Sequence, residues 1–129
     1  MAQIKIYGLK EQLEPRRETL SDVIHSCAVD ALGLPPDKRF HRFIALEKAD
    51  FIFPSGRSDD YTIIEISMFK GRSTMAKKRL INLLFERLNA HLGIAVDDIE
   101  ITIFETPKKN WGIRGKPGDE LELSYSVTV

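Results

Sequence analysis

A strand–helix–strand pattern occurs twice along the chain, and it constrains the fold more than any other feature of the sequence. In the first half, Gln3 to Leu9 alternates between apolar and polar residues and Phe40 to Leu46 is apolar enough for a second strand. Between them, apolar residues at helical spacing predict a helix from Pro15 to about Leu32. Pro15 suits the first turn of a helix, where a missing N–H costs nothing, and Gly33 suits its left-handed end.

The second half repeats this order. Tyr61 to Phe69 is rich in β-branched and aromatic residues, which favours a largely buried strand. Ser73 or Thr74 can cap a following helix, and Gly93 ends it. Ile99 to Phe104 then alternates as a strand.

Residues 3–46 and 61–105 thus follow one plan, which indicates an internal duplication of a β-α-β unit within a single domain, 1–129. The predicted fold class is α/β (α+β), with a four-stranded mixed sheet and two helices on one face. The other face has no cover in so short a chain, so other subunits are expected to bury it. Residues 121–128 alternate as a strand, which either extends a neighbouring subunit's sheet or pairs within its own chain.

Composition narrows the function and the compartment. Lys+Arg and Asp+Glu are 19 each, so the chain lacks the basic excess of a dedicated nucleic-acid binder. One cysteine, no signal peptide and no membrane-length apolar stretch predict a soluble cytoplasmic protein without a membrane partner. Because Ala2 is small, we expect Met1 to be removed, which leaves the Ala2 amine as the N-terminus.

The most promising local chemistry lies between the third strand and the second helix. Lys70 and Arg72 stand beside a helix N-terminus, and Gly71 lets a ligand approach the backbone. Together with the basic residues 77–79, they predict a site for a carboxylate or a phosphate. The alternative is that these long side chains simply extend into water.

A second candidate is the glycine-rich loop around Trp111, the only tryptophan, which stands near Arg114 and Lys116. A loop tryptophan beside a cation lines a pocket or an interface, or else covers the core from a turn. No metal-ligand spacing links the histidines and the cysteine, and no dinucleotide or phosphate-loop motif is present. We therefore expect neither a metal nor a cofactor.

Taken in order, these motifs resemble the tautomerase superfamily and, within it, the malonate semialdehyde decarboxylase-like group. The resemblance covers nearly the whole chain and rests on the duplicated plan together with four short segments: Leu32-Gly33-Leu34-Pro35, Lys70-Gly71-Arg72-Ser73, Leu92-Gly93-Ile94 before Asp97-Asp98, and Trp111. It implies a homotrimer with sites near its subunit interfaces that acts on small 2-oxo or 3-oxo carboxylic acids.

The resemblance also implies roles for single residues. Family enzymes use an N-terminal proline as general base or acid, and Ala2 occupies that position here, so this chain departs from the pattern. The decarboxylase's pair of arginines, which holds the substrate carboxylate, corresponds to Lys70 and Arg72. The acidic residue of the decarboxylase corresponds to a position near Asp37, displaced by one residue. The aromatic residues near the C-terminal end of the family's chains correspond to Trp111, which is expected in the pocket wall.

Three hypotheses follow. The first is a tautomerase-like or decarboxylase-like enzyme in which Lys70 and Arg72 hold a small carboxylate, Trp111 and Arg114 line the pocket, and the Ala2 amine or a water moves the proton. The alternative is a catalytically weak or inactive trimeric binding protein for small organic anions. A purely structural trimer with a solvated basic loop is the third reading.

Overall fold

Four strands form a mixed sheet in the order β2-β1-β3-β4, in a computed structural model that describes residues 2–129. The strands are β1 (Ala2–Leu9), β2 (His41–Leu46), β3 (Thr62–Phe69) and β4 (Ile99–Thr106). β1 runs parallel to β2, β3 runs parallel to β4, and the two central strands β1 and β3 are antiparallel. The predicted removal of Met1 concerns a residue outside the described range.

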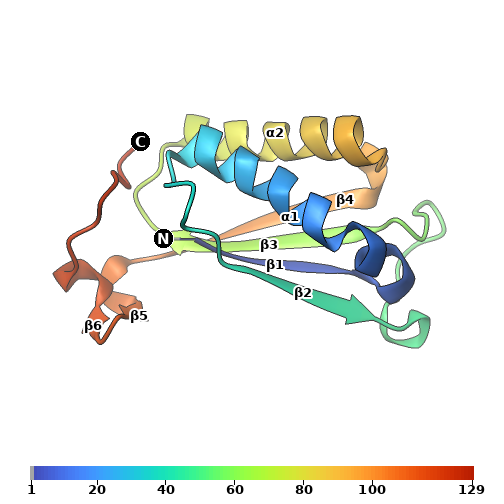
Figure 1. Cartoon of the computed structure of the whole chain (residues 1–129), viewed down its shortest axis with the longest axis horizontal. Helices are drawn as coiled ribbons and strands as arrows, with labels where there is room; N and C mark the ends of the chain where they lie inside the picture. The colour runs from blue at the N-terminus through green and yellow to red at the C-terminus, as the bar shows by residue number, and fades with distance from the viewer. Residues whose placement is uncertain (1) are drawn as a thin grey trace.

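Two long helices, α1 (Lys10–Leu32) and α2 (Thr74–Leu92), connect the parallel pairs and lie together on one face of the sheet (Figure 1). The chain therefore contains two successive β-α-β units joined through β1 and β3. The predicted fold class, a four-stranded mixed sheet with two helices on one face, is confirmed. Among residues 2–129, no helix is both long and apolar enough to span a bilayer.

Local sequence signals explain where the helices end. Gly33 and Gly93 both adopt left-handed backbone conformations, with φ of 68° and 67°, at the C-termini of α1 and α2. The side-chain oxygen of Ser73 accepts a hydrogen bond from the Ala76 N–H at 3.1 Å and so caps the N-terminus of α2. Of the two predicted caps, Ser73 is the one used.

The predicted start of the first helix is wrong. The helix α1 begins at Lys10, directly after β1, and Pro15 lies inside it. The physical reason is packing, because Leu13 is buried against the sheet and its side chain lies 3.0 Å from where a Cβ on Gly8 would be. Burial of Leu13 holds the first helical turns in place, and the missing N–H of Pro15 removes one hydrogen bond near the helix start.

The core lies between the helices and the inner face of the sheet. The central strands contribute Ile6, Ile64 and Ile66, and all three side chains are fully buried. Cys27 is fully buried on α1, and burial raises the pKa of its thiol. The core cluster includes several fully buried side chains of α1 and α2, namely Leu20, Ile24, Leu32, Leu84 and Leu88.

The opposite face of the sheet carries no helix. Glu65, at its centre, accepts a hydrogen bond from the Tyr7 hydroxyl at 2.8 Å and lies 3.9 Å from the Lys5 ammonium. On the edge strand, Phe104 is 48% exposed. That other subunits cover this face stays a prediction.

Residues 51–53 contain no helix or strand, and Phe51 and Phe53 pack on Tyr61 as an aromatic cluster. One predicted strand is absent from residues 2–129. Residues 121–128 form no strand within this chain, so pairing within the chain is wrong and pairing with a neighbouring subunit stays a prediction. The alternating apolar residues of the C-terminal segment pack against Phe69 instead. A short hairpin, β5 (Gly112–Ile113) and β6 (Lys116–Pro117), precedes it.

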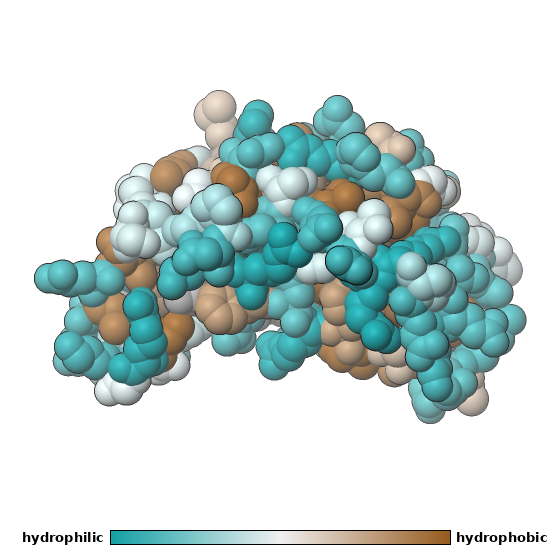
Figure 2. Space-filling view, in the orientation of Figure 1, coloured by the Kyte–Doolittle hydropathy of each residue, from teal (hydrophilic) through white to brown (hydrophobic). Residues whose placement is uncertain are grey.

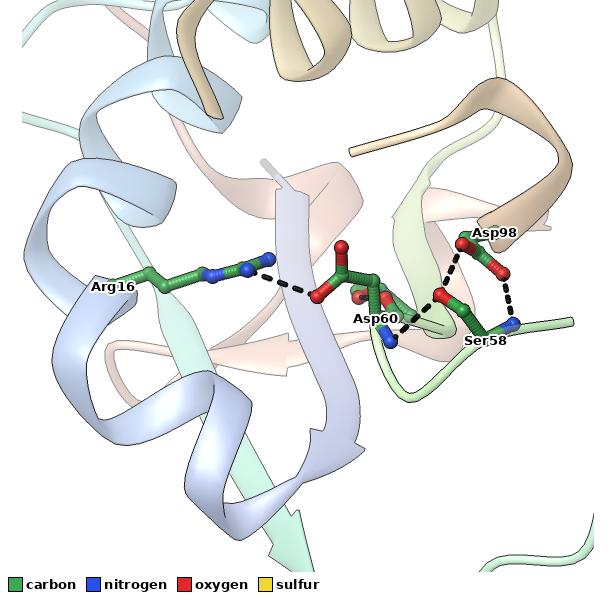
Figure 3. A network of polar contacts seen from close by, with 5 residues as sticks. Arg16, Ser58, Asp60 and Asp98 are labelled. Atoms are coloured by element: carbon green, nitrogen blue, oxygen red, sulfur yellow. Dashed lines mark hydrogen bonds and ion pairs between the residues drawn. The ribbon is translucent and has the colours of Figure 1, made fainter. Parts of the chain in front are cut away.

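A polar network fixes the long connection between β2 and β3 at the end of the sheet opposite to the chain termini (Figures 1 and 3). The carboxylate of Asp98, which is buried, accepts hydrogen bonds from the Ser58 N–H at 2.8 Å and the Ser58 hydroxyl at 2.6 Å. Asp60 then pairs with Arg16 of α1 at 2.9 Å. The network joins three segments: α1, the connection between β2 and β3, and the turn before β4.

We expect stability to fall in mild acid because of His41. The ring centroids of His41 and His25 lie 6.0 Å apart in an edge-on arrangement, and Nδ1 of His41 lies 2.7 Å from the Ser21 hydroxyl oxygen. Burial, and to a smaller extent the charges of His25 and Arg39, lower the pKa of His41 to about 4. Between pH 6.5 and 4 the unfolded chain binds the proton and the folded chain does not, so stability falls as pH falls through this window. A shift of this size corresponds to about 3 kcal/mol.

Urea unfolding between pH 7 and 4 tests this expectation. The variant His41→Gln should show a shallower loss of unfolding free energy across the window. The matched control His91→Gln, at an exposed position, should keep the wild-type slope. Equal slopes for the wild type and His41→Gln would contradict the assignment.

Candidate active site

The loop from β3 to α2 carries the predicted anion-binding residues. The Lys70 N–H donates to the Thr106 carbonyl at 2.9 Å and so extends the pairing of β3 with β4 by one residue. Gly71 follows with φ of 141°, a conformation that side chains rarely adopt, and it turns the chain toward α2. This turn places Arg72 immediately before the Ser73 cap.

Arg72 is the most unusual residue of this loop. It is only 5% exposed, and its Nη1 donates to the Phe69 carbonyl at 3.1 Å. Its Nε and Nη2 are buried and have no hydrogen-bond partner in the described chain. A buried guanidinium normally uses its donors on a carboxylate or on backbone oxygens, so two idle donors mark a place where an acceptor is missing.

The nearest carboxylate does not fill that place. Glu105 lies close enough to act electrostatically on Arg72, but its oxygen binds the Lys77 ammonium at 2.8 Å. Burial lowers the pKa of Arg72, and the charge and polar contact of Tyr125, together with the charge of Glu105, oppose this effect. The contact between Arg72 and Tyr125 lies outside hydrogen-bond geometry, so it does not satisfy Nε or Nη2. Since an arginine stays protonated in proteins, the site keeps a positive charge that no acceptor neutralises directly. Lys77, which the sequence analysis grouped with the anion site, forms an ion pair with Glu105 instead.

The C-terminal segment, residues 121–129, covers Arg72. Val127 packs against Gly71, with its side chain 3.1 Å from where a Cβ would be, and the Ser73 hydroxyl donates to the Val129 carbonyl at 2.8 Å. The Tyr125 hydroxyl is buried next to Arg72 and also lacks a hydrogen-bond partner among residues 2–129. Figure 2 shows hydrophobic side chains gathered at the end of the molecule where this segment and the β5–β6 hairpin lie.

Aromatic residues form the adjoining wall. Trp111 packs edge-on against the fully buried Phe69, with ring centroids 5.0 Å apart. Behind them Gly118 donates its N–H to the Trp111 carbonyl, and a Cβ there would lie 2.6 Å from the Lys108 carbonyl oxygen. Trp111 thus covers the small apolar cluster around Phe69, the residue whose carbonyl accepts the hydrogen bond from Arg72.

The structure brings most of the predicted site residues to one end of the sheet. Ala2 pairs with Met68 at the start of β1, next to the end of β3, and both chain termini lie at this end (Figure 1). Arg114 is exposed at the tip of the β5–β6 hairpin with φ of 52°, and its charge acts on Tyr125. Lys70, two residues before Arg72, is exposed on the surface.

Asp37 lies at the same end of the sheet as this group but makes no described contact with Arg72. It lies exposed in the turn between α1 and β2, whose backbone is fixed by the Lys38 N–H bonding to the Pro35 carbonyl at 3.0 Å. Because β2 starts beside the start of β1, this turn is at the same end of the sheet as Ala2. No described contact joins Asp37 to Arg72, so its catalytic role stays a prediction.

Sequence reasoning did not single out Tyr125 or Glu105 as site residues. Both are distant in sequence from Arg72, and an alternating pattern does not show where an irregular segment folds back. Only the contacts of the folded chain reveal them. Within residues 2–129 there is also no cluster of three His, Cys, Asp or Glu side chains suited to a metal ion.

The sequence profile of the tautomerase enzyme family matches residues 38–114, more than half of the chain. The chain belongs to the tautomerase family. A curated relative, the 2-hydroxymuconate tautomerase of Pseudomonas putida, is 35% identical over 57 residues, which are 44% of this family member and 90% of the relative. The enzyme of the same name from Comamonas testosteroni matches to the same extent. Each relative therefore corresponds to about half of this longer tautomerase-family chain.

Solved structures support the same assignment along most of the chain. A malonate semialdehyde decarboxylase superposes with a TM-score of 0.80 at 22% identity, over 92% of this chain and 99% of that one. The FG41 malonate semialdehyde decarboxylase reaches 28% identity and a TM-score of 0.76, over 85% and 87% of the two chains. Native fused 4-OT gives a TM-score of 0.80 at 21% identity, over 92% and 98%. The resemblance to the tautomerase superfamily and its decarboxylase-like group is confirmed.

Proposed function

We propose that this protein is a tautomerase-like or decarboxylase-like enzyme that acts on a small 2-oxo or 3-oxo carboxylic acid. The observation that carries the proposal is Arg72, a guanidinium buried in the chain with two unused donors. A carboxylate supplies two acceptor oxygens in a plane, which matches the fork of an arginine. The exposed Lys70 adds a second, solvated positive charge that attracts the anion.

The proposed chemistry follows from this charge. Tautomerisation or decarboxylation of an oxo acid passes through an enolate, whose negative charge develops on the former carbonyl oxygen. In tautomerisation the carboxylate stays bound to Arg72, whereas in decarboxylation it leaves as carbon dioxide and the C–C bond electrons pass to the enolate. While Arg72 holds the carboxylate, Lys70 is the cation available to the enolate oxygen. The proton is carried by the Ala2 amine or by an ordered water. An unperturbed α-amino group titrates at about 7.7–8.0, so it exchanges protons near neutral pH even without the family's proline ring.

We also propose that the active form is a homotrimer. One solved neighbour, a fused 4-OT, is an asymmetric trimer with a TM-score of 0.78 to this chain. The helix-free face of the sheet, with the half-exposed Phe104, supplies a surface for subunit contacts. The duplicated β-α-β plan supports a single domain built from two units, each comparable in length to the curated relatives.

A catalytically inactive anion-binding protein is the second candidate. The observation that favours it is Ala2, which stands where family enzymes carry the N-terminal proline. This alternative predicts saturable binding of small oxo acids without product.

Proton NMR of the purified, mass-checked protein with phenylenolpyruvate and, separately, with malonate semialdehyde tests the proposal. We expect turnover above the buffer rate, and a loss of at least about 100-fold in Arg72→Ala, because the variant removes the buried charge that holds the carboxylate. The matched control is Arg79→Ala, which removes an exposed arginine of α2 and should leave turnover unchanged. Turnover that is equal in Arg72→Ala and the wild type would contradict the role of Arg72. Binding without turnover would support the inactive binding protein.

A further inference from the structure

Tyr125 lies beside Arg72 with its own hydrogen-bonding capacity unused. Its hydroxyl is buried, and neither the backbone nor a side chain of residues 2–129 bonds to it. A buried hydroxyl without a partner costs about 1–3 kcal/mol, so a folded chain seldom leaves one idle without a reason. The Tyr125 hydroxyl and the Nε and Nη2 atoms of Arg72, all without hydrogen-bond partners among residues 2–129, are neighbours in the structure.

We propose that Tyr125 is a ligand-binding residue, whose hydroxyl donates a hydrogen bond to the same carboxylate that Arg72 holds. The inference rests on the proposed function of Arg72 and extends it. The anion then accepts from three groups, Nε and Nη2 of Arg72 and the hydroxyl of Tyr125, which all lack acceptors among residues 2–129. An added acceptor satisfies every one of these groups at once.

The protonation state of the phenol suits this role. Burial raises the pKa of Tyr125, and the charge and polar contact of Arg72, together with the charge of Arg114, oppose this effect. The phenol is therefore neutral at pH 7 and acts as a donor. A phenolate would instead pair with Arg72 and compete with the ligand.

The C-terminal segment that carries Tyr125 also controls how a ligand reaches Arg72. Tyr125 belongs to the C-terminal segment, which is fastened over the site by the Ser73–Val129 hydrogen bond and by the contact of Val127 with Gly71. The segment thus forms the cover of the site and carries one of its ligand-binding groups. The charges near the ligand are the buried guanidinium of Arg72 and the exposed ammonium of Lys70, with the Glu105 carboxylate opposing them, and this balance favours a small monoanion such as an oxo acid over a phosphate dianion.

Titration of the full-length protein with sodium pyruvate tests the proposal, with binding followed at the indole N–H signal of Trp111, the only tryptophan. Trp111 belongs to the same apolar cluster as Tyr125, so its signal reports on the site. We expect saturable binding of pyruvate, and an affinity at least about 10-fold weaker in Tyr125→Phe, because a hydrogen bond to a charged group is lost. Inorganic phosphate should bind more weakly than pyruvate.

Stability separates this role from a structural one. Because the Tyr125 hydroxyl has no hydrogen-bond partner among residues 2–129, Tyr125→Phe should unfold at the same urea concentration as the wild type or at a higher one. The matched control Tyr7→Phe breaks the hydrogen bond to Glu65 on the open sheet face. It should lower stability and leave pyruvate affinity unchanged.

The possible failures are distinguishable. If Arg72→Ala abolishes pyruvate binding and Tyr125→Phe binds as the wild type does, the role of Tyr125 is overturned and that of Arg72 stands. If Tyr125→Phe is destabilised or changes the oligomeric state by light scattering, the hydroxyl is structural and the proposal is overturned. If the wild type does not bind pyruvate, or binds it equally well without Arg72, the proposed function fails and the inference fails with it.

Discussion

Replacing Arg72 with methionine should make the protein more stable and at the same time remove its affinity for small carboxylates. Arg72 loses its hydration on burial and recovers only one hydrogen bond, to the Phe69 carbonyl. Replacing such poorly compensated buried charges with apolar residues of similar volume is often stabilising by about 1–4 kcal/mol. We expect a gain of about 1–3 kcal/mol in the unfolding free energy, since the bond to Phe69 is lost.

Urea unfolding at a fixed protein concentration, together with pyruvate titration, checks both halves of this result. The pyruvate affinity should fall at least about 100-fold, because the carboxylate loses its charged partner. Arg79→Met is the matched control, and an exposed substitution of this kind should change stability by less than about 0.5 kcal/mol. A destabilised Arg72→Met would show that the guanidinium serves the fold rather than a ligand.

Replacing Asp98 with alanine should cost stability without touching the candidate site. The buried carboxylate of Asp98 is the acceptor for both the N–H and the hydroxyl of Ser58, so the variant removes both hydrogen bonds (Figure 3). Hydrogen bonds to charged groups contribute about 1.5–3 kcal/mol each, and we expect a total loss of about 2–4 kcal/mol. The connection at residues 51–61 should also become less protected from hydrogen exchange.

The position of Asp98 makes the prediction selective. It precedes β4 at the start of the strand, whereas Arg72 follows the far end of the neighbouring strand β3. Pyruvate affinity should therefore be unchanged in Asp98→Ala. Asp97→Ala, at the exposed neighbouring position, should unfold like the wild type. A large effect on affinity, or none on unfolding, would contradict this account of the network.

The regular part of the fold was predictable because its signals are periodic and local. Alternation along β1 and β4, helical spacing in α1 and α2, and the two left-handed glycines are each properties of a short stretch of sequence. Pro15 shows the limit of this approach. Its preference for a helix start is overridden by the burial of Leu13, which is a contact with another element.

The candidate site was predictable only in part, for the same reason. Lys70, Gly71 and Arg72 are adjacent, so the charge and the turn are visible together in the sequence. The burial of Arg72 depends on residues 121–129, whose alternation predicted a strand although they form none in this chain. The pairing of Tyr125 with Arg72 spans more than 50 residues, and only the folded structure reveals it.

The most direct test of the central claim is a crystal structure of the protein soaked with sodium pyruvate. We expect a carboxylate oxygen within hydrogen-bond distance, about 2.7–3.2 Å, of Nε or Nη2 of Arg72, beneath the C-terminal segment. The claim would be contradicted by pyruvate bound elsewhere, or by Nε and Nη2 of Arg72 bonded to protein acceptors with no anion between them.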